Sequence, residues 1–326
     1  MILILSKKEG DFTTEVVIDW LYHSDKECFI RVNSESFLES LVFSLSSNCS
    51  EVITNNQFLD FNKINVIWYR RWSNGVEFEL LLNQESTNFT LNNFIKREFN
   101  SLSSSFFSVF KNKKWLSKPN INKLLNKYDV LAEAKKVGLN VPNTIITNSK
   151  SQLQSFHKKN INLITKPIGE VSQYEYKQKN HLQYTRIINK NEINTFPDFF
   201  FPSLFQKQIL KDFEIRTFYL EGLFYSMAIF SQNDDKTSVD FRRYNIAKPN
   251  RNIPFKLPKS IEKKLKCLLD IYAFDTASID IIKGLDGEYY FLEINPVGQF
   301  GMVSIPCNYY LESKVADYLI KQNYVS

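Results

Sequence analysis

Glycine is scarce in this sequence. Only 9 of the 326 residues are glycine, and neither G-x-G-x-x-G nor G-x-x-x-x-G-K-[ST] occurs. A dinucleotide-binding fingerprint and a P-loop both need such glycines, because their backbone turns tightly and approaches phosphate closely. The sequence therefore excludes these two nucleotide-binding motifs.

Closely spaced cysteines and histidines are also missing. The cysteines, Cys28, Cys49, Cys267 and Cys307, are widely separated and form no C-x-x-C pair, and the 3 histidines lie far apart in polar stretches. These spacings predict neither a zinc ribbon nor a disulfide framework, and reduced thiols are the simplest interpretation.

Long hydrophobic runs are absent as well. The apolar start "MILIL" is followed by Ser6 and then by charged residues from Lys7, and no run approaches the length that spans a bilayer. We therefore expect no signal peptide, no membrane partner and a cytoplasmic protein.

The composition that remains is that of an ordinary globular protein, with 43% hydrophobic and 23% charged residues. The net charge of +6 is typical of a lysine-rich surface. No RNP-like, zinc-finger or basic-helix pattern accompanies it, so we expect no nucleic-acid partner. A cationic surface would equally suit ATP or an acidic peptide.

The pattern of apolar residues predicts an α/β and α+β chain in three lobes. Residues 1–117 form an N-terminal α/β lobe, and the polar stretch 111–120, broken by Pro119, marks its end. Residues 118–202 form a central lobe, and residues 203–326 form a C-terminal lobe rich in antiparallel strands.

Individual elements follow from the same pattern. In the first two lobes we expect strands at 1–6, 64–72, 143–148 and 161–167, and helices at 92–110, 121–139 and 149–159. Gly138 and Pro142 would end the helix 121–139. In the third lobe we expect consecutive antiparallel strands at 203–210, 213–222 and 223–232, a helix at 259–274, a hairpin, a loop and a final helix at 309–322.

The hairpin around Asp286-Gly287 carries the most informative pattern. Asp-Gly is a strong two-residue turn, because both positions tolerate positive φ. If Leu285 pairs with Glu288, the following pairs are fixed: Asp280 with Glu293, Ile282 with Phe291, and Ser278 with Asn295.

Paired residues share one face of a sheet, so Asp280, Glu293 and Asn295 would converge on one patch. The other face would then be core, with Ile279, Ile281, Leu292 and Ile294. Two carboxylates placed opposite each other repel unless a cation lies between them. Two carboxylates and an amide oxygen suit Mg²⁺. The alternative is an acidic, solvent-facing hairpin with no ligand.

Several basic and acidic residues upstream have two interpretations each. Lys127 and Lys166 are surface lysines or phosphate ligands. Glu214 and Arg216 lie on one strand face and either form an ion pair or bind a substrate, Arg216 with a phosphoryl or acyl-phosphate group. Arg242 and Arg243, in "DFRRYN", are again surface or site residues. Asp240 is a weak candidate for a general base.

The order of these residues along the chain resembles the ATP-grasp superfamily of carboxylate–amine ligases. The resemblance extends from about residue 118 to the C-terminus, and the Asp…Glu-x-Asn hairpin is its most specific element. It implies an ATP-grasp fold with an N-terminal pre-ATP-grasp lobe, and ATP and Mg²⁺ as cofactors.

The resemblance also implies a role for each candidate. Lys127 and Lys166 are similar to the two lysines that hold ATP phosphates, and Lys207 and Gln208 to the segment that meets adenine. Glu214 resembles the acid that binds ribose. Three arginines, Arg216, Arg242 and Arg243, resemble the cations around the γ-phosphate and acyl phosphate. The Mg²⁺ ligands would be Asp280, Glu293 and Asn295.

More narrowly, the chain resembles the graspetide (microviridin-type) peptide ligases, and within them the maturases of grasp-with-spasm systems. "VIWYRRW", "NKYDVLAEAKKVGLNVPNTIITN", "DFRRYN" and "FLEINPVGQFGMVSIPCNYYLESKVADYL" carry this resemblance. It implies a ribosomal precursor peptide, with a leader and a core, whose Asp or Glu side chain is joined to a Ser/Thr hydroxyl or a Lys amine. Leader contacts are expected in the central lobe, and a homodimer is one assembly left open.

One feature departs from the superfamily. The segment after the second lysine, "KPIGEVSQYEYKQKN", contains only Gly169, whereas many ATP-grasp enzymes have a glycine-rich loop there. Two other functions stay open: an ATP-grasp ligase that adds a free amino acid to a carboxylate, and a peptide-binding relic without catalysis.

Overall fold

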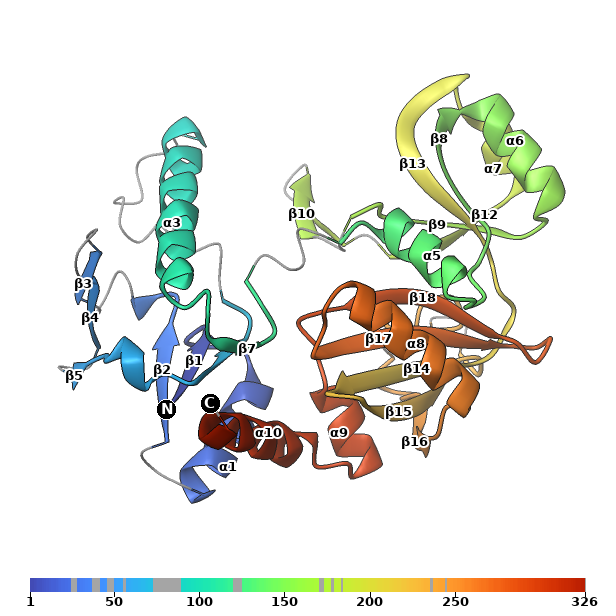
Figure 1. Cartoon of the computed structure of the whole chain (residues 1–326). Helices are drawn as coiled ribbons and strands as arrows, with labels where there is room; N and C mark the ends of the chain where they lie inside the picture. The colour runs from blue at the N-terminus through green and yellow to red at the C-terminus, as the bar shows by residue number, and fades with distance from the viewer. Residues whose placement is uncertain are drawn as a thin grey trace. The chain divides into compact units, whose positions relative to one another are not determined.

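The structure is a computed structural model of the chain. It describes residues 1–24, 28–36, 42–45, 50–54, 57–72, 89–119, 125–169, 173–176, 179–182, 184–234, 237–243 and 245–325. Contacts divide the chain into two compact units. Unit 1 comprises Met1–Ile121 and Tyr310–Ser326, and unit 2 comprises Asn122–Tyr309. Figure 1 shows the elements of each unit.

Unit 1 is built around a parallel sheet with strand order β2-β1-β6-β7. Its elements are β1 (Ile2–Ser6), α1 (Phe12–Ser24), β2 (Phe29–Asn33), β3 (Val42–Leu45), β4 (Ser50–Thr54), β5 (Gln57–Phe58), a 3-10 turn (Phe61–Lys63), β6 (Val66–Tyr69), α3 (Phe89–Val109), β7 (Lys114–Leu116) and α10 (Leu311–Val325). β3, β4 and β5 form a separate antiparallel sheet. Every residue of β1 is buried, as expected for a parallel strand covered on both faces.

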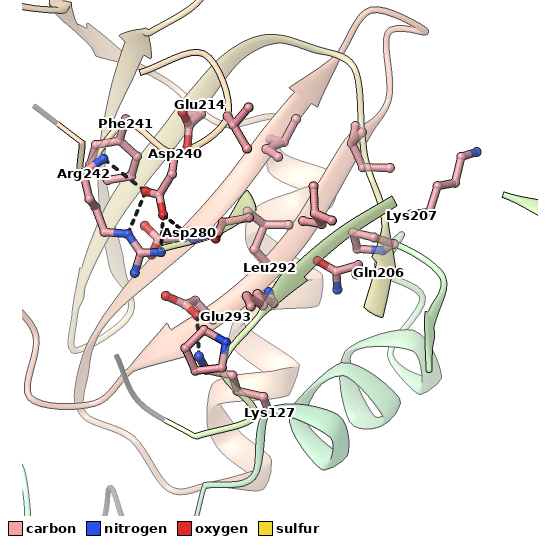
Figure 2. Close-up of a pocket in the computed structure, with 18 residues that line it drawn as sticks. Lys127, Gln206, Lys207, Glu214, Asp240, Phe241, Arg242, Asp280, Leu292 and Glu293 are labelled. Atoms are coloured by element: carbon pink, nitrogen blue, oxygen red, sulfur yellow. Dashed lines mark hydrogen bonds and ion pairs between the residues drawn. The ribbon is translucent and has the colours of Figure 1, made fainter. Parts of the chain in front are cut away.

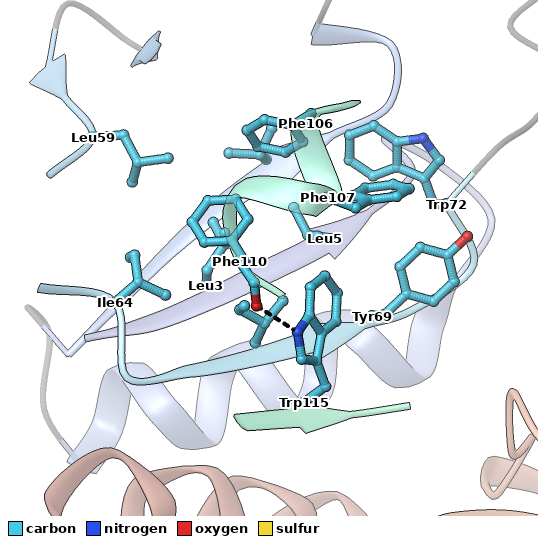
Figure 3. Packing of buried hydrophobic residues seen from close by; sticks show 12 residues of the cluster. Leu3, Leu5, Leu59, Ile64, Tyr69, Trp72, Phe106, Phe107, Phe110 and Trp115 are labelled. Atoms are coloured by element: carbon cyan, nitrogen blue, oxygen red, sulfur yellow. Dashed lines mark hydrogen bonds between the residues drawn. The ribbon is translucent and has the colours of Figure 1, made fainter. Parts of the chain in front are cut away.

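The core of unit 1 is aromatic. Phe106, Phe107 and Phe110, in and just after α3, pack with Trp72 and Trp115 (Figure 3). Several of these rings meet edge to face, such as Phe106 and Phe110 with centroids 5.4 Å apart. The indole N–H of Trp115 donates to the Phe110 carbonyl at 3.0 Å, so its polar atom is satisfied inside the core.

Unit 2 contains two larger sheets and a hairpin. Its elements are α5 (Lys127–Lys136), β8 (Thr144–Ser149), α6 (Lys150–Lys159), β9 (Leu163–Lys166), β10 (Gln173–Tyr176), β11 (Lys179–Leu182), β12 (Arg186–Ile188), α7 (Lys190–Thr195), β13 (Phe199–Lys207), β14 (Lys211–Leu220), β15 (Leu223–Phe230), β16 (Arg251–Phe255), α8 (Lys259–Ile271), β17 (Thr276–Gly284), β18 (Tyr289–Asn295) and α9 (Gly301–Cys307). The sheet orders are β12-β9-β13-β8 and β16-β15-β14-β17-β18, and β10 pairs with β11.

Local sequence explains several boundaries. Asn126 caps α5, because its side chain accepts a hydrogen bond from the Tyr128 amide at 2.8 Å. After the helix Gly138 adopts φ +85°, as predicted for the residue that ends it. Glu221 and Gly222 both have positive φ and join β14 to β15, which confirms the predicted turn.

The α/β and α+β character is confirmed, but two predictions about elements are wrong. β13 pairs with β8 and β9, so the predicted strand at 203–210 is no sheet neighbour of β14. The loop predicted before the last helix contains α9, which runs through Pro306. The start of the predicted helix 121–139 lies outside the described residues up to residue 124, and α5 begins at Lys127.

The three-lobe division remains a prediction. Contacts separate the two units at Ile121/Asn122 and at Tyr309/Tyr310, and they assign α10, which contacts α1, to unit 1. The expected boundary at 202/203 falls inside β13. Among the helices that the structure describes, none has the length and apolar character needed to cross a bilayer.

Candidate active site

A pocket in unit 2 brings together most of the predicted site residues. It holds about 700 Å³ of space between its atoms, part of it open to solvent. Its walls come from the start of α5, from β9, β13, β14, β17 and β18, and from the loop around residue 240 (Figure 2). The predicted residues that line it are Lys127, Lys166, Lys207, Glu214, Arg242, Asp280 and Glu293.

Asp280 and Glu293 are directly paired across β17 and β18, as predicted. The predicted register between this pair and the turn is wrong, however. Next to the turn, Ile282 pairs with Tyr290 and Ile281 with Phe291, one position away from the predicted register. An irregularity between Asp280 and Ile281 then inserts one extra residue into β18 and restores the predicted pair.

The extra residue in β18 also changes which side chains are core. Phe291 is 1% exposed and belongs to the core, whereas Leu292 lines the pocket beside Glu293. The prediction that Leu292 faces the core is therefore wrong. A bulge re-aims the side chain next to it, and here it adds an apolar wall to the charged site.

Each carboxylate of the pair has its own cation. A terminal nitrogen of Arg216, Nη1, donates to both oxygens of Asp280, at 2.7 and 2.6 Å. The ammonium of Lys127 lies 3.7 Å from Glu293, as Figure 2 shows. α5 contacts β18, so the first residue of this helix reaches the carboxylate.

These partners affect the two carboxylates differently. Burial raises the pKa of Asp280, and the Arg216 guanidinium opposes this without overcoming it. Burial also acts to raise the pKa of Glu293, but the ammonium groups of Lys166 and Lys127 outweigh it, so the pKa lies below its usual value. The site therefore stabilises an anion strongly at Glu293, where two cations converge.

Lys166 ends β9 and faces the same space. Burial lowers the pKa of its ammonium, and the positive charges of Lys127 and Arg242 act in the same direction. The negative charge of Glu293 acts to raise this pKa without overcoming them. A cluster of three cations in a pocket suits a ligand with several negative charges, such as a triphosphate.

Arg242 is held by Asp240. Its Nε and Nη2 atoms each donate to this carboxylate at 2.8 Å, and the backbone N–H of Thr185 donates to Asp240 at 3.2 Å. Burial acts to raise the pKa of Asp240, but the hydrogen bonds and charge of Arg242 outweigh it and lower the pKa. A paired carboxylate with a lowered pKa is a poor base, so the candidate role of Asp240 as a general base is not supported.

Glu214 does not pair with Arg216, although the two share a strand face. Its Oε1 atom accepts hydrogen bonds from Lys211 at 2.5 Å and from Ser231 at 2.8 Å. Arg216 bonds to Asp280 instead. From the sequence alone, an ion pair between Glu214 and Arg216 was one of two possibilities. Nothing in the sequence indicated that Ser231 and Asp280 would be the partners.

Of the two residues predicted to meet adenine, Lys207 lines the pocket and Gln208 does not. Gln206 and Ile209 line it too. Gln206 is 1% exposed, and its Nε2 donates to Thr144 at 2.8 Å. Alternation along β13 could have indicated Gln206, because Phe205 before it is core and the next side chain must face the other way.

Three predicted residues occupy other positions. Asn295 pairs with Ser278 at the end of β18 and lines a second, adjoining pocket that shares Lys127 and Glu293 with the first. Arg243 lies over the ring of Tyr184, 5.4 Å from its centroid, and is not part of the lining of the first pocket. Arg216 reaches the site through Asp280.

The donor set fits a hard divalent cation. Asp280 and Glu293 supply paired carboxylates and Asn295, two residues further along β18, supplies an amide oxygen. Among the described residues there is no group of three or more His, Cys, Asp or Glu side chains that could hold a metal ion. Arg216 and Lys127 now balance the charges that such an ion would meet.

The chain is similar to several solved structures over nearly its whole length. No family model and no curated protein match the sequence. The RiPP-associated ATP-grasp ligase of Chryseobacterium gregarium, solved with ADP and a leader and core peptide, is 25% identical with a TM-score of 0.85, covering 98% of this chain and 96% of its own. The macrocyclase MdnC of Microcystis aeruginosa MRC, bound with precursor peptide MdnA, is 22% identical with a TM-score of 0.82, covering 98% and 99%.

The ATP-grasp ligase PsnB, complexed with a minimal precursor, Mg and ADP, has a TM-score of 0.78 at 17% identity and covers 99% of this chain and 97% of its own. All three similarities extend over nearly the whole length of both chains. Together with the paired carboxylates and the cations around them, they identify this chain as an ATP-grasp ligase of the graspetide type.

Proposed function

We propose that this protein is an ATP- and Mg²⁺-dependent ligase that closes rings in a ribosomal precursor peptide. It activates Asp or Glu side chains and joins them to Ser/Thr hydroxyl or Lys amine groups, which gives ω-ester or ω-amide macrocycles. The observation that carries the proposal is the directly paired Asp280 and Glu293 in a pocket lined by Lys127, Lys166 and Arg242. The similar structures that hold precursor peptides and ADP support it.

The reaction needs ATP because a carboxylate does not react with an alcohol in neutral water. Hydroxide is a poor leaving group, whereas phosphate is a good one. Transfer of the γ-phosphoryl group to the peptide carboxylate gives an acyl phosphate and ADP. Attack by the hydroxyl or amine then releases inorganic phosphate and leaves the ester or amide.

The acidic and basic residues of the site have different roles. Asp280, Glu293 and Asn295 would hold Mg²⁺, which when bound neutralises charge on the nucleotide phosphates. Lys127 and Lys166 bind and orient those phosphates. Arg216 and Arg242 stabilise negative charge on the acyl phosphate and on the tetrahedral intermediate that follows.

The nucleoside end of ATP occupies the other part of the pocket. Ile164, Ile282 and Leu292 offer apolar surface to the base, and Gln206 and Lys207 offer polar groups from β13. Glu214 receives the ribose. Arg243 is assigned no direct part, because it stacks on Tyr184.

The peptide partner binds in two parts. A leader segment holds the precursor on the central lobe while the core segment enters the site, so ring closure is intramolecular and proximity supplies part of the rate. Within the graspetide ligases we assign the protein to the grasp-with-spasm maturases, acting in the cytoplasm.

Two other functions predict different products. A ligase that adds a free amino acid would raise the mass of its acceptor by one residue. A relic that only binds peptide would leave it unchanged. The complete set of cations and carboxylates argues against a relic, because buried charges are costly to keep without use.

Incubation with ATP, Mg²⁺ and the cognate precursor, followed by mass spectrometry, tests the proposal. Each ring removes one water, so we expect a loss of about 18 Da per ring, with one ADP formed for each. Addition of a residue mass would support the amino-acid ligase, and an unchanged peptide without ADP formation would support the relic.

A further inference from the structure

The Lys211 side chain of β14 lies on the same face as Glu214. In a regular strand, residues three positions apart point to opposite faces, so Lys211 and Glu214 of β14 should not meet. An irregularity in the pairing of β14 with β17, between Lys211 and Phe213, inserts one extra residue. This bulge turns Lys211 to the face of Glu214, and its ammonium donates to Glu214 at 2.5 Å.

Both groups are buried. Lys211 is 7% exposed and Glu214 is 8% exposed, and Ser231, which also donates to Glu214, is fully buried. A buried ion pair contributes little net stability, because desolvation cancels most of the attraction. A bulge and a buried pair beside a pocket therefore point to a role in placing the carboxylate.

Both donors bond to the same carboxylate oxygen of Glu214. Lys211 and Ser231 both bond to Oε1, at 2.5 and 2.8 Å. No residue in the described part of the chain donates to Oε2, although Glu214 lines the pocket. A carboxylate fixed by one oxygen leaves the other as a hydrogen-bond acceptor for a ligand.

We propose that Lys211 and Ser231 are positioning residues that hold Oε1 of Glu214, so that Oε2 accepts hydrogen bonds from the ribose hydroxyls of ATP. This inference rests on the proposed function, since it needs ATP in the pocket. Lys211 has a second link, because its ammonium lies 3.4 Å from the carbonyl of Val239, next to Asp240. The same lysine thus joins the ribose acid to the loop that carries Arg242.

The inference predicts how the protein distinguishes sugars. With the carboxylate held in place, loss of one ribose hydroxyl removes a charge-assisted hydrogen bond, so ATP binds about tenfold or more tightly than 2′-deoxy-ATP or 3′-deoxy-ATP. Without Lys211 the carboxylate rotates freely, and the affinity for ATP falls while that for the deoxynucleotide changes little. The ratio of the two affinities therefore falls towards one.

The experiment is calorimetric titration of ATP, 2′-deoxy-ATP and 3′-deoxy-ATP, each with Mg²⁺, into the full chain and its Lys211→Met and Ser231→Ala variants. We expect the ratio to fall several-fold in both variants, more in Lys211→Met. Lys266→Met is the matched control, because it removes a lysine that pairs with Asp270 on the exposed side of α8, and its ratio should stay at the wild-type value.

Outcomes separate this inference from the proposed function. If the unmodified chain binds ATP but both variants keep its ratio for each deoxynucleotide, the positioning role is wrong and the ligase proposal stands. If the unmodified chain binds no ATP, both fail. If Lys211→Met does not fold, Ser231→Ala decides, and in a Glu214→Gln background Ser231→Ala should change the ratio no further.

Discussion

Asp280 and Glu293 face each other across two strands because an extra residue, Leu292, enters β18 immediately before Glu293. Two opposed carboxylates would repel, and the structure balances them separately, Asp280 by Arg216 and Glu293 by Lys127. In the proposed function, a metal ion and a nucleotide would join these two cations at the pair.

Removal of one carboxylate should stop ring formation. Glu293→Gln keeps the size of the side chain but loses its charge. We expect the rate of ring formation to fall about 100-fold or more, because residues that only orient metal ligands already contribute about 10- to 100-fold. Mass spectrometry of the precursor over time measures this. Glu288→Gln, on the same hairpin and exposed, is the control. A Glu293→Gln variant that closes rings at the wild-type rate would contradict the role of Glu293 at the metal site.

Leu292 should contribute to nucleotide affinity and little to folding. It is half-buried in the pocket wall, so Leu292→Ala removes apolar contact with the base and should weaken ATP binding by about three- to tenfold. Titration with ATP measures the affinity, and thermal unfolding measures the stability. Leu285→Ala in the exposed turn should change neither. Equal ATP affinity in the two variants would contradict the position assigned to Leu292.

Asp240 should act through Arg242 and not as a base. Asp240→Asn weakens the hold on Arg242, and we expect a fall in rate of about tenfold. Because its pKa is already lowered, Asp240 stays ionised at neutral pH, so the pH dependence of the rate above about pH 5 should keep its shape in the variant. Loss of a titration step near neutral pH would instead indicate a base. The exposed Asp212→Asn is the control.

A buried ion pair in unit 1 should make its stability depend on pH. Arg70 donates to Asp11 at 3.0 Å, and both are buried. Burial acts to raise the pKa of Asp11, but Arg70, Thr14 and Thr13 outweigh it, so the folded pKa lies below its usual value. The stabilisation is therefore present above the unfolded pKa of about 3.9 and is lost as pH falls through the folded pKa.

Asp11→Asn measures this contribution. At pH 7 it should lower the free energy of unfolding by about 3–5 kcal/mol, because the buried Arg70 loses the negative charge of Asp11. The difference from wild type should shrink below about pH 4 in denaturant unfolding. Asp19→Asn, on the exposed face of α1, should have little effect at either pH. A difference that does not change with pH would contradict the lowered pKa.

Elements were predictable where one local signal fixes them. The apolar run of β1, the turn at Glu221-Gly222 and the glycine after α5 are examples. Sheet membership was harder, since β13 is adjacent to β14 in sequence but pairs with β8 and β9. The helix α9 was missed because it is short, Gly301–Cys307, and contains Pro306, a residue that ordinarily interrupts a helix.

Single residues of the site were also hard to predict where packing, and not a local sequence signal, decides their position. The pairing of Asp280 with Glu293 was predicted correctly only because two errors cancelled: the turn has a different register, and the bulge at Leu292 restores the pair. Bulges depend on packing against neighbouring strands, so a turn rule cannot reveal them. The partners of Glu214 were hidden for the same reason, since a second bulge brings Lys211 to it.

The central claim is that a peptide carboxylate receives phosphate before the ring closes. A precursor whose acidic side chains carry ¹⁸O in both oxygens tests this directly, with the released inorganic phosphate analysed by mass spectrometry. Acyl-phosphate chemistry transfers one labelled oxygen from the carboxylate to phosphate for each ring, so one ¹⁸O should appear per phosphate formed. Phosphate without label, formed while rings close, would contradict the account.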